Sequence, residues 1–533
     1  HSVTGQAYVS IGAFAKAEPH LTAAAQLRER VLGPENADTL GSEGNLASLY
    51  GRQGRLAESE ALLQKTLEAQ KRVLGEEHQD TLSNMNNLGV LYAEQGRLAE
   101  SESMHRRTRE IEERVLGEEH PATLSNLSNL ATVLQQRGRY HEAETLMRKG
   151  LEIERRTHGE ESPGVITGMG NLAFLYSEQG RLVEAEELMK KALKMQERVM
   201  GPEHPSTFGS MGNLAMLYSR QGRNAEALEL MQKTLEIEQR ALGEEHPMTL
   251  ATRNNIAVVH RSEGRYAEAE ALHLSTLEIQ KRVLGKEHPS TLSSMANLAT
   301  LYRIQRRFDE AEKLMLDGLQ IEKRVLGEQH PSTLSSMGSL AYVYFVQGRH
   351  AEAEELFTTT LEADRRVLGD EHSQTLGVLT NFGLLYNAMG RFEEAAKMFE
   401  TSLPLKMRVL GLQHPWTGIA ASGLEAAYRG MGKPELGPRK VMQFAIALAE
   451  DPRASAMAVN AAAWQLLTGP VEELRDAKRA LVLAQRACQL AEKEESRELW
   501  NMLDTLALAQ HRNGDTAAAV VTQGVDEVTV TAG

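Results

Sequence analysis

The stretch 171–181 reads Asn-Leu-Ala-Phe-Leu-Tyr-Ser-Glu-Gln-Gly-Arg, and Glu-Ala-Glu follows it at 184–186. Related stretches return along the chain every 42 residues. One glycine series keeps this spacing without insertion or deletion: Gly33, Gly75, Gly117, Gly159, Gly201, Gly243, Gly285, Gly327, Gly369 and Gly411. A second series is interrupted once by Arg306: Gly54, Gly96, Gly138, Gly180, Gly222, Gly264, Gly348 and Gly390. A fixed period of this length predicts a repeat architecture with one supersecondary unit per repeat.

Each repeat carries two apolar stripes with helical spacing, as the unit 121–162 illustrates. The first stripe comprises Leu124, Leu127, Leu130, Ala131 and Leu134, and the second comprises Tyr140, Ala143, Met147, Gly150 and Leu151. Pro121 suits the first helical position, and Gly138 supplies the left-handed residue that ends the helix. We therefore predict two antiparallel helices of about sixteen to twenty residues per unit, whose stripes are buried by stacking on neighbouring units.

The pattern Asn-Leu-Ala-x-Leu-Tyr-x-x-Gln-Gly-Arg resembles a tetratricopeptide repeat, a unit of about 34 residues. The longer period here, with the linker Arg-Val-Leu-Gly-Glu-Glu-His-Pro-x-Thr-Leu at 114–124, is similar to the variety in kinesin light chains and in bacterial multi-repeat signalling proteins. The resemblance implies an all-α, right-handed superhelical solenoid of tetratricopeptide helix-turn-helix repeats. First helices would line its concave face, and second helices would lie outside.

This resemblance predicts three segments. Residues 1–12 look like a truncated first helix, 13–432 form the array, and 433–533 contain divergent repeats and a C-terminal cap. The last segment, with Asp504-Thr-Leu-Ala-Leu-Ala and Asn513-Gly-Asp, resembles the C-terminal repeats of certain bacterial receptor-like serine/threonine kinases. Because the first residue is His1 rather than Met, we expect the chain to be part of a longer one.

Composition narrows the range of partners. The formal net charge is −14 and is spread along the chain, so neither nucleic acid nor an anionic membrane is an expected partner. No apolar run approaches the roughly 20 residues of a membrane span, which predicts no membrane insertion. Cys488 is the single cysteine, which favours a reducing, cytoplasmic location.

No pattern in the chain predicts catalysis. Phosphate-binding glycine loops, the His-Glu-x-x-His motif and the Gly-x-Ser-x-Gly motif are all missing from the sequence. Histidines recur before or near the prolines of the linkers, but equivalent residues on successive repeats lie about 10 Å apart, whereas zinc ligands converge within about 2 Å of one ion. We predict that these histidines cap helices, and that the chain has no metal, no other cofactor and no enzymatic activity.

One asparagine per repeat directly precedes an apolar pair, usually Leu-Ala, and we call this series the ladder. It comprises Asn45, Asn87, Asn129, Asn171, Asn213, Asn255, Asn297 and Asn381. The resemblance places it on the concave face, like the asparagine ladders of the O-linked N-acetylglucosamine transferase. An asparagine side chain both donates and accepts, so it can bond a peptide backbone of any sequence. The alternative is that each amide bonds the neighbouring helix and fixes the stack.

Other candidate binding residues surround the ladder. Four residues before it stand mostly small side chains, which leave room for a ligand: Ser83, Ser125, Thr167, Gly209, Ala251, Ser293 and Ser335. Three residues after it stand Phe174, Met216, Tyr342 and Leu384, which suit either apolar pockets or the core. Arg220, Arg261 and Arg303 form either a basic stripe for an acidic or C-terminal carboxylate ligand, or a solvated face.

These patterns predict a protein–protein interaction scaffold that binds peptide segments of partner proteins in a concave groove. Two alternatives stay open. The array is also compatible with a regulatory or docking arm of a larger signalling enzyme, a protein kinase or a nucleotide-binding ATPase, whose catalytic domain is not in this chain. Self-association through the solenoid ends is the third interpretation.

Overall fold

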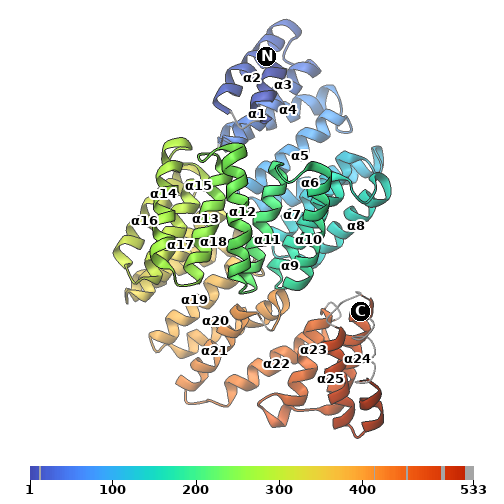
Figure 1. The fold of residues 1–533 in the computed structure, drawn as a ribbon, viewed down its shortest axis with the longest axis vertical. Helices are drawn as coiled ribbons and strands as arrows, with labels where there is room; N and C mark the ends of the chain where they lie inside the picture. Colours follow the sequence, from blue (N-terminus) through green and yellow to red (C-terminus); the bar gives the residue numbers. More distant parts are fainter. Residues whose placement is uncertain (11–13, 54, 413, 452–453, 494–498, 523–533) are drawn as a thin grey trace. The chain divides into compact units, whose positions relative to one another are not determined.

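A computed structural model of the chain describes residues 1–10, 14–53, 55–412, 414–451, 454–493 and 499–522 (Figure 1). Within these ranges every regular element is a helix, which confirms the predicted all-α fold. The chain forms two compact units. The first unit comprises His1–Val343 and Glu362–Gly369, and the second comprises Tyr344–Leu361 and Asp370–Gly533.

The helices alternate as predicted. Before the first repeat stand α1 (Ser2–Ser10) and α2 (Phe14–Leu32). The first helices of the repeats are α3 (Ala37–Arg52), α5 (Gln79–Glu94), α7 (Pro121–Gln136), α9 (Pro163–Glu178), α11 (Pro205–Arg220), α13 (Pro247–Ser262) and α15 (Pro289–Ile304). The second helices are α4 (Leu56–Val73), α6 (Leu98–Val115), α8 (Tyr140–His158), α10 (Leu182–Met200), α12 (Asn224–Leu242), α14 (Tyr266–Val283) and α16 (Phe308–Val325).

Later helices continue the series. The pair α17 (Pro331–Val346) and α18 (His350–Val367) contributes residues to both units. The second unit continues with α19 (Ser373–Ala388), α20 (Phe392–Leu410), α21 (Pro415–Gly430), α22 (Leu436–Glu450), α23 (Ala456–Thr468), the 3-10 turn η1 (Glu472–Leu474), α24 (Ala477–Lys493) and α25 (Leu499–Arg512). Helical structure therefore continues through the predicted divergent repeats, whereas part of the predicted segment 1–12 lies outside the described residues.

A histidine directly precedes each first helix from α5 to α21 except α9, where Ser162 takes its place. In α7 the Ala122 backbone N–H donates to Nδ1 of His120 at 3.2 Å, and Pro121 brings no N–H that would need a partner. The same bond, from the backbone N–H two residues later, forms at His78, His204, His246, His288, His330, His372 and His414. The predicted capping role of these histidines is confirmed.

The turn inside each pair needs a left-handed residue. Gly138 has φ 71°, a conformation that costs glycine little because it has no Cβ. Arg306 takes this place in one repeat and is forced to φ 61°, the one positive φ among the described non-glycine residues. The repeat geometry thus imposes the turn even where the sequence opposes it.

Both predicted stripes are buried by stacking. Leu130, Ala131 and Leu134 of α7 and Ala143 of α8 are each 0 % exposed. Each buried Leu side chain contributes about 1.5–3 kcal/mol relative to an exposed one. At Gly150 an added Cβ would lie 2.9 Å from Leu127 Cδ2, so glycine allows α8 to approach α7 closely.

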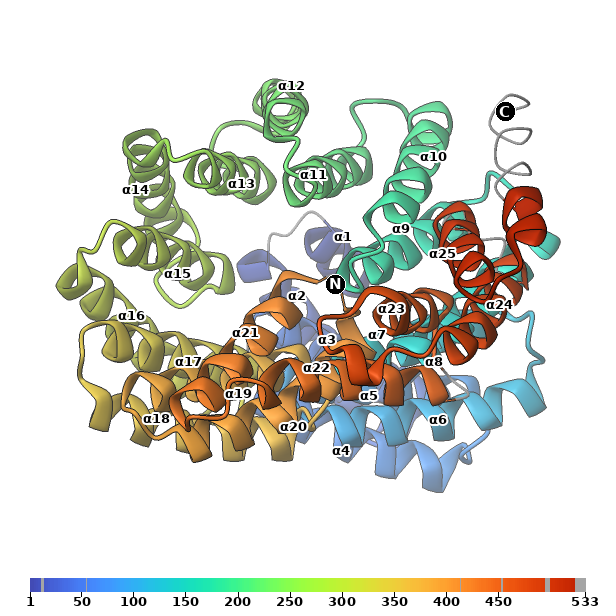
Figure 2. The ribbon, with the colours of Figure 1, turned by 90° about the horizontal axis from the view of Figure 1, so that it is seen from below.

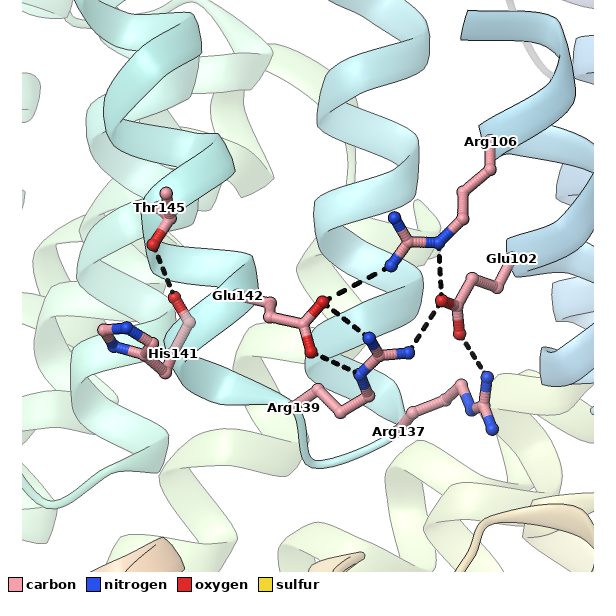
Figure 3. A network of polar contacts seen from close by, with 7 residues as sticks. All are labelled: Glu102, Arg106, Arg137, Arg139, His141, Glu142 and Thr145. Carbon is pink, nitrogen blue, oxygen red and sulfur yellow. Dashed lines mark hydrogen bonds and ion pairs between the residues drawn. The ribbon is translucent and has the colours of Figure 1, made fainter. Parts of the chain in front are cut away.

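An arginine after the turn glycine fastens each repeat to the one before it. Figure 3 shows Arg139 donating through Nη1 to Glu102 of the preceding repeat at 2.7 Å, and through Nε to Glu142 of its own repeat at 2.7 Å. Glu102 also accepts from Arg106 and Arg137. The same pairing with the preceding repeat recurs at Arg55–Glu18, Arg97–Glu60, Arg181–Glu144, Arg223–Glu186, Arg307–Glu270 and Arg391–Glu354.

Within the first unit, one junction lacks this fastening. Leu228 occupies the place of the glutamate on α12, and His260 replaces the tyrosine whose ring lies under the arginine in most other repeats. Arg265 instead pairs with Glu263 of its own turn. Helix packing, the pair Arg282–Glu245 and the hydrogen bond between Thr252 and Glu238 remain at the junction between α11–α12 and α13–α14.

This difference predicts unequal effects of the same substitution. Arg181 donates to the largely buried Glu144 at 2.9 Å and lies 3.8 Å from the Tyr176 ring centroid. Arg181→Ala should lower local stability by about 2 kcal/mol, because a partly buried carboxylate loses a cation. Arg265→Ala should cost about 0.5 kcal/mol or less, as expected of an exposed pair. Hydrogen exchange of α9–α10 and of α13–α14 measures both losses, and equal losses would contradict the fastening role.

Candidate functional site

First helices lie on the inner side of the curved stack in the part of the first unit from α9 to α16. Figure 2 shows α9, α11, α13 and α15 inside α10, α12, α14 and α16. Because second helices cover the outer side, a ligand on the inner side meets side chains of the first helices. The predicted arrangement is confirmed for this part of the chain.

Each ladder asparagine lies on a first helix beside a buried apolar pair. Asn171 is followed by Leu172 and Ala173, which are 3 % and 0 % exposed. Every ladder side chain is nevertheless partly or fully exposed to solvent. Asn45, Asn87, Asn129, Asn171, Asn213, Asn255 and Asn297 belong to the first unit, and Asn381 belongs to the second.

The ladder amides are almost unused inside the protein. Asn129 Nδ2 donates to Asn86 Oδ1 at 3.1 Å. Across the described ranges, no hydrogen bond of the other ladder side chains is found. An exposed amide on a helix is satisfied by water, so each of these groups can exchange water for a ligand.

A different polar position holds the repeats together. Asn126, three residues before the ladder, is 0 % exposed, and its Nδ2 donates to Glu112 Oε2 at 3.0 Å. Its Oδ1 lies 2.8 Å from Nδ1 of His105. Burial raises the pKa of Glu112 against the effect of this bond, and burial lowers the pKa of His105. This buried network was not predicted from the sequence. Polar residues nevertheless recur at the position of Asn126 in other repeats: Asn84, Ser210, Thr252, Ser294 and Ser336.

The small residues before the ladder and the apolar residues after it differ in their exposure to solvent. Ser83, Ser125, Thr167, Ala251, Ser293 and Ser335 are exposed. Phe174 is 50 % exposed, whereas Met216, Tyr342 and Leu384 are only partly exposed. Of the predicted apolar groups, Phe174 is the most accessible to a ligand on the first helices.

The three predicted arginines have different surroundings. Arg220 donates to the Ser177 hydroxyl and to Glu178 Oε1, each at 2.8 Å, so its charge is already compensated. Arg303 lies over the Tyr342 ring, 5.0 Å from the centroid. Arg261 is partly buried, and its Nη1 has no hydrogen-bond partner. These side chains therefore do not act as one uniform stripe.

Among the described residues, no group of three or more His, Cys, Asp or Glu side chains is placed to hold a metal ion. None of the helices described is long and apolar enough to cross a membrane. Burial, together with the charge of Glu492, raises the pKa of the Cys488 thiol to about 11, so little reactive thiolate forms near neutral pH.

Stacked helix pairs with exposed, repeated polar groups define a repeat scaffold. Overlapping matches to the tetratricopeptide repeat model cover residues 38–114, 80–156, 123–198, 164–237, 206–273, 249–321, 297–366, 332–407 and 375–436. The chain therefore belongs to the tetratricopeptide repeat family, and its repeats form a protein–protein interaction scaffold. The predicted likeness of residues 433–533 to kinase repeats stays a prediction.

Solved structures with similar repeats include a putative kinesin light chain with nearly identical repeats from Podosopora anserina. It is 32 % identical, with a TM-score of 0.33, over 38 % of this chain and 97 % of that one. Another is BtubC (BKLC) from P. vanneervenii, 24 % identical with a TM-score of 0.36, over 43 % of this chain and 92 % of that one. No curated protein matches the chain.

Proposed function

We propose that the inner side of the first helices binds a peptide segment of a partner protein, with the ladder amides bonding its backbone. One observation carries this proposal. Asn171, Asn213 and Asn255 are accessible and unbonded, whereas the buried Asn126, three residues before the ladder, bonds Glu112 and His105. Helix interiors disfavour asparagine, so an asparagine repeated without an internal partner calls for an external one.

The spacing of the repeats suits an extended ligand. Packed helices lie about 8–10 Å apart, and an extended chain rises about 3.3 Å per residue. Successive ladder amides would therefore meet the backbone at about every third peptide residue. The intervening peptide side chains would contact the small residues before the ladder and Phe174, and these contacts would select the sequence.

The test uses a peptide selected from a random library against the unaltered chain. The triple variant Asn171→Ala, Asn213→Ala, Asn255→Ala should bind this peptide at least about 100-fold more weakly, because several backbone hydrogen bonds of about 1 kcal/mol each are lost. The variant should not lose stability, since alanine is the better helix former. Isothermal titration calorimetry and circular dichroism measure the two properties.

The matched control carries Thr145→Ala and Gln232→Ala, two exposed positions on the second helices α8 and α12. It should bind the peptide like the unaltered chain. If the triple variant also binds normally while helical, the ladder has no part in binding. If the control loses binding as well, the ligand lies on the outer helices.

A further inference from the structure

Two neighbouring guanidinium groups in the first unit lack an anion. Arg261 stands near the end of α13, and Arg303 stands at the equivalent position of α15. Within the described part of the chain, neither side chain has a carboxylate or a hydrogen-bond acceptor. The Nη1 of Arg261 is inaccessible and unpaired, and the Arg303 guanidinium lies over the Tyr342 ring.

The surroundings of Arg261 disfavour its positive charge and do not compensate it. Burial lowers the pKa of Arg261, and the charge of Arg303 lowers it further. Burial, with a smaller effect of Arg261, lowers the pKa of His273 on α14 to about 4, so that ring stays neutral. A cation held close to another cation, away from water, is unfavourable unless an anion joins them.

Other half-buried arginines of this chain pair with carboxylates. Arg220 on the preceding first helix bonds Glu178, and Arg181 bonds both Glu144 and Glu184. The chain also has an excess of acidic residues, with a net charge of −14. Two adjacent unpaired arginines in such a chain cannot be explained by a shortage of carboxylates.

We propose that Arg261 and Arg303 form an anion site between α13 and α15 that takes an oxyanion, a carboxylate or phosphate group. Guanidinium is a planar fork of donors that matches the paired oxygens of such groups and can bind them in a bidentate way. An oxyanion between the two arginines also removes their mutual repulsion. Where a bound peptide carries the oxyanion, the inference rests on the proposed function, and it makes an acidic residue the specificity determinant of the peptide.

Two probes test the site separately. Inorganic phosphate, against sodium chloride at matched ionic strength, tests for a free oxyanion by thermal unfolding. A fluorescent oligo-glutamate, against oligo-glutamine, tests for carboxylates carried by a peptide. Because the net charge is −14, an acidic peptide has no general attraction to the surface, and binding reports a local site.

Phosphate should raise the melting temperature of the unaltered chain, and oligo-glutamate should bind while oligo-glutamine does not. Arg261→Gln should remove the phosphate response and weaken oligo-glutamate binding at least about 10-fold. Arg303→Gln should act in the same direction. Arg220→Gln is the matched control and should leave both responses unchanged, because Glu178 already occupies its guanidinium.

The outcomes separate this inference from the proposed function. If phosphate acts like chloride and oligo-glutamate binds the unaltered chain and the Arg261→Gln variant equally, the anion site is refuted. If Arg261→Gln loses both responses while the triple asparagine variant keeps them, the anion site stands independently of the ladder. The ladder proposal then fails only if the triple variant also binds the selected peptide normally. A response to phosphate without one to oligo-glutamate supports a site for free anions.

Discussion

Replacing Lys406 with methionine is expected to stabilise α20 and α21 by about 3–5 kcal/mol below neutral pH. Lys406 is 1 % exposed. Its Nζ lies 3.4 Å from the Trp416 carbonyl oxygen and 5.4 Å from the centroid of the Trp416 ring. No carboxylate pairs with it in the described part of the chain. Burial consequently lowers the pKa of Lys406 to about 7. Methionine fills a similar volume without a charge.

The origin of this burial is a repeat position that is polar throughout the array. Its other members include Gln70, Glu112, Gln196, Glu238, Gln280, Glu322 and Asp364. In α6, Glu112 accepts a hydrogen bond from Asn126, which lies fourteen residues later in the sequence. The residue fourteen positions after Lys406 is Ala420, which has no polar side chain. Lys406 therefore keeps the buried position but has lost the polar partner.

The pH dependence follows from the direction of the shift. The pKa is about 7 in the folded state and near the ordinary 10.5 in the unfolded state, so the folded protein disfavours the charged amine. The destabilisation is complete below about pH 7, shrinks as the pH rises toward 10.5, and disappears above it. The advantage of Lys406→Met should shrink over the same interval.

Urea unfolding followed by tryptophan fluorescence measures this difference, because Trp416, Trp464 and Trp500 all belong to the second unit. Lys397→Met, at an exposed position of α20, is the matched control and should change stability little at either pH. A Lys406→Met advantage that is equal at pH 6 and pH 10 would show that the buried charge is not its cause.

Asn126→Ala is expected to cost about 2–3 kcal/mol of local stability in α6–α7. Its amide bonds Glu112, the His105 carbonyl and the His105 ring, and alanine would leave buried polar groups of both residues unpaired. Asn171→Ala, in the ladder, should cost nothing and could gain up to about 0.5 kcal/mol.

Hydrogen exchange of α6–α7 in the Asn126→Ala variant and of α9 in the Asn171→Ala variant measures the two changes in local stability. The contrast separates a structural asparagine from one kept for another purpose. A loss of similar size at Asn171 would favour the interpretation in which the ladder fixes the stack.

The regular features of this protein were predictable because the residues that produce them recur in almost every repeat. The helix pairs, the histidine caps and the Gly-Arg turns each depend on residues close in sequence, and the period confirms them many times. Features that depend on a partner in another repeat were not predicted. The unpaired Arg261, the missing glutamate at Leu228 and the buried Lys406 each follow from what stands one repeat away.

A signal for these exceptions was nevertheless present in the sequence. In the aligned repeats, Leu228 and Ala396 stand where the others have glutamate. Ala420 stands where most repeats have asparagine, serine or threonine, with Gly168 and Val378 as further exceptions, so the missing partners are visible in the sequence. The boundary between the two units has no such signal, because the period runs through residues 344–369 without interruption.

The most direct test is a crystal structure of the chain with a library-selected peptide. The account predicts an extended peptide along the first helices, with the side-chain amides of Asn171, Asn213 and Asn255 within hydrogen-bond distance of its main-chain N–H and C=O groups. A peptide seated on the second helices, or one that crosses the first helices and leaves these amides in water, would contradict it.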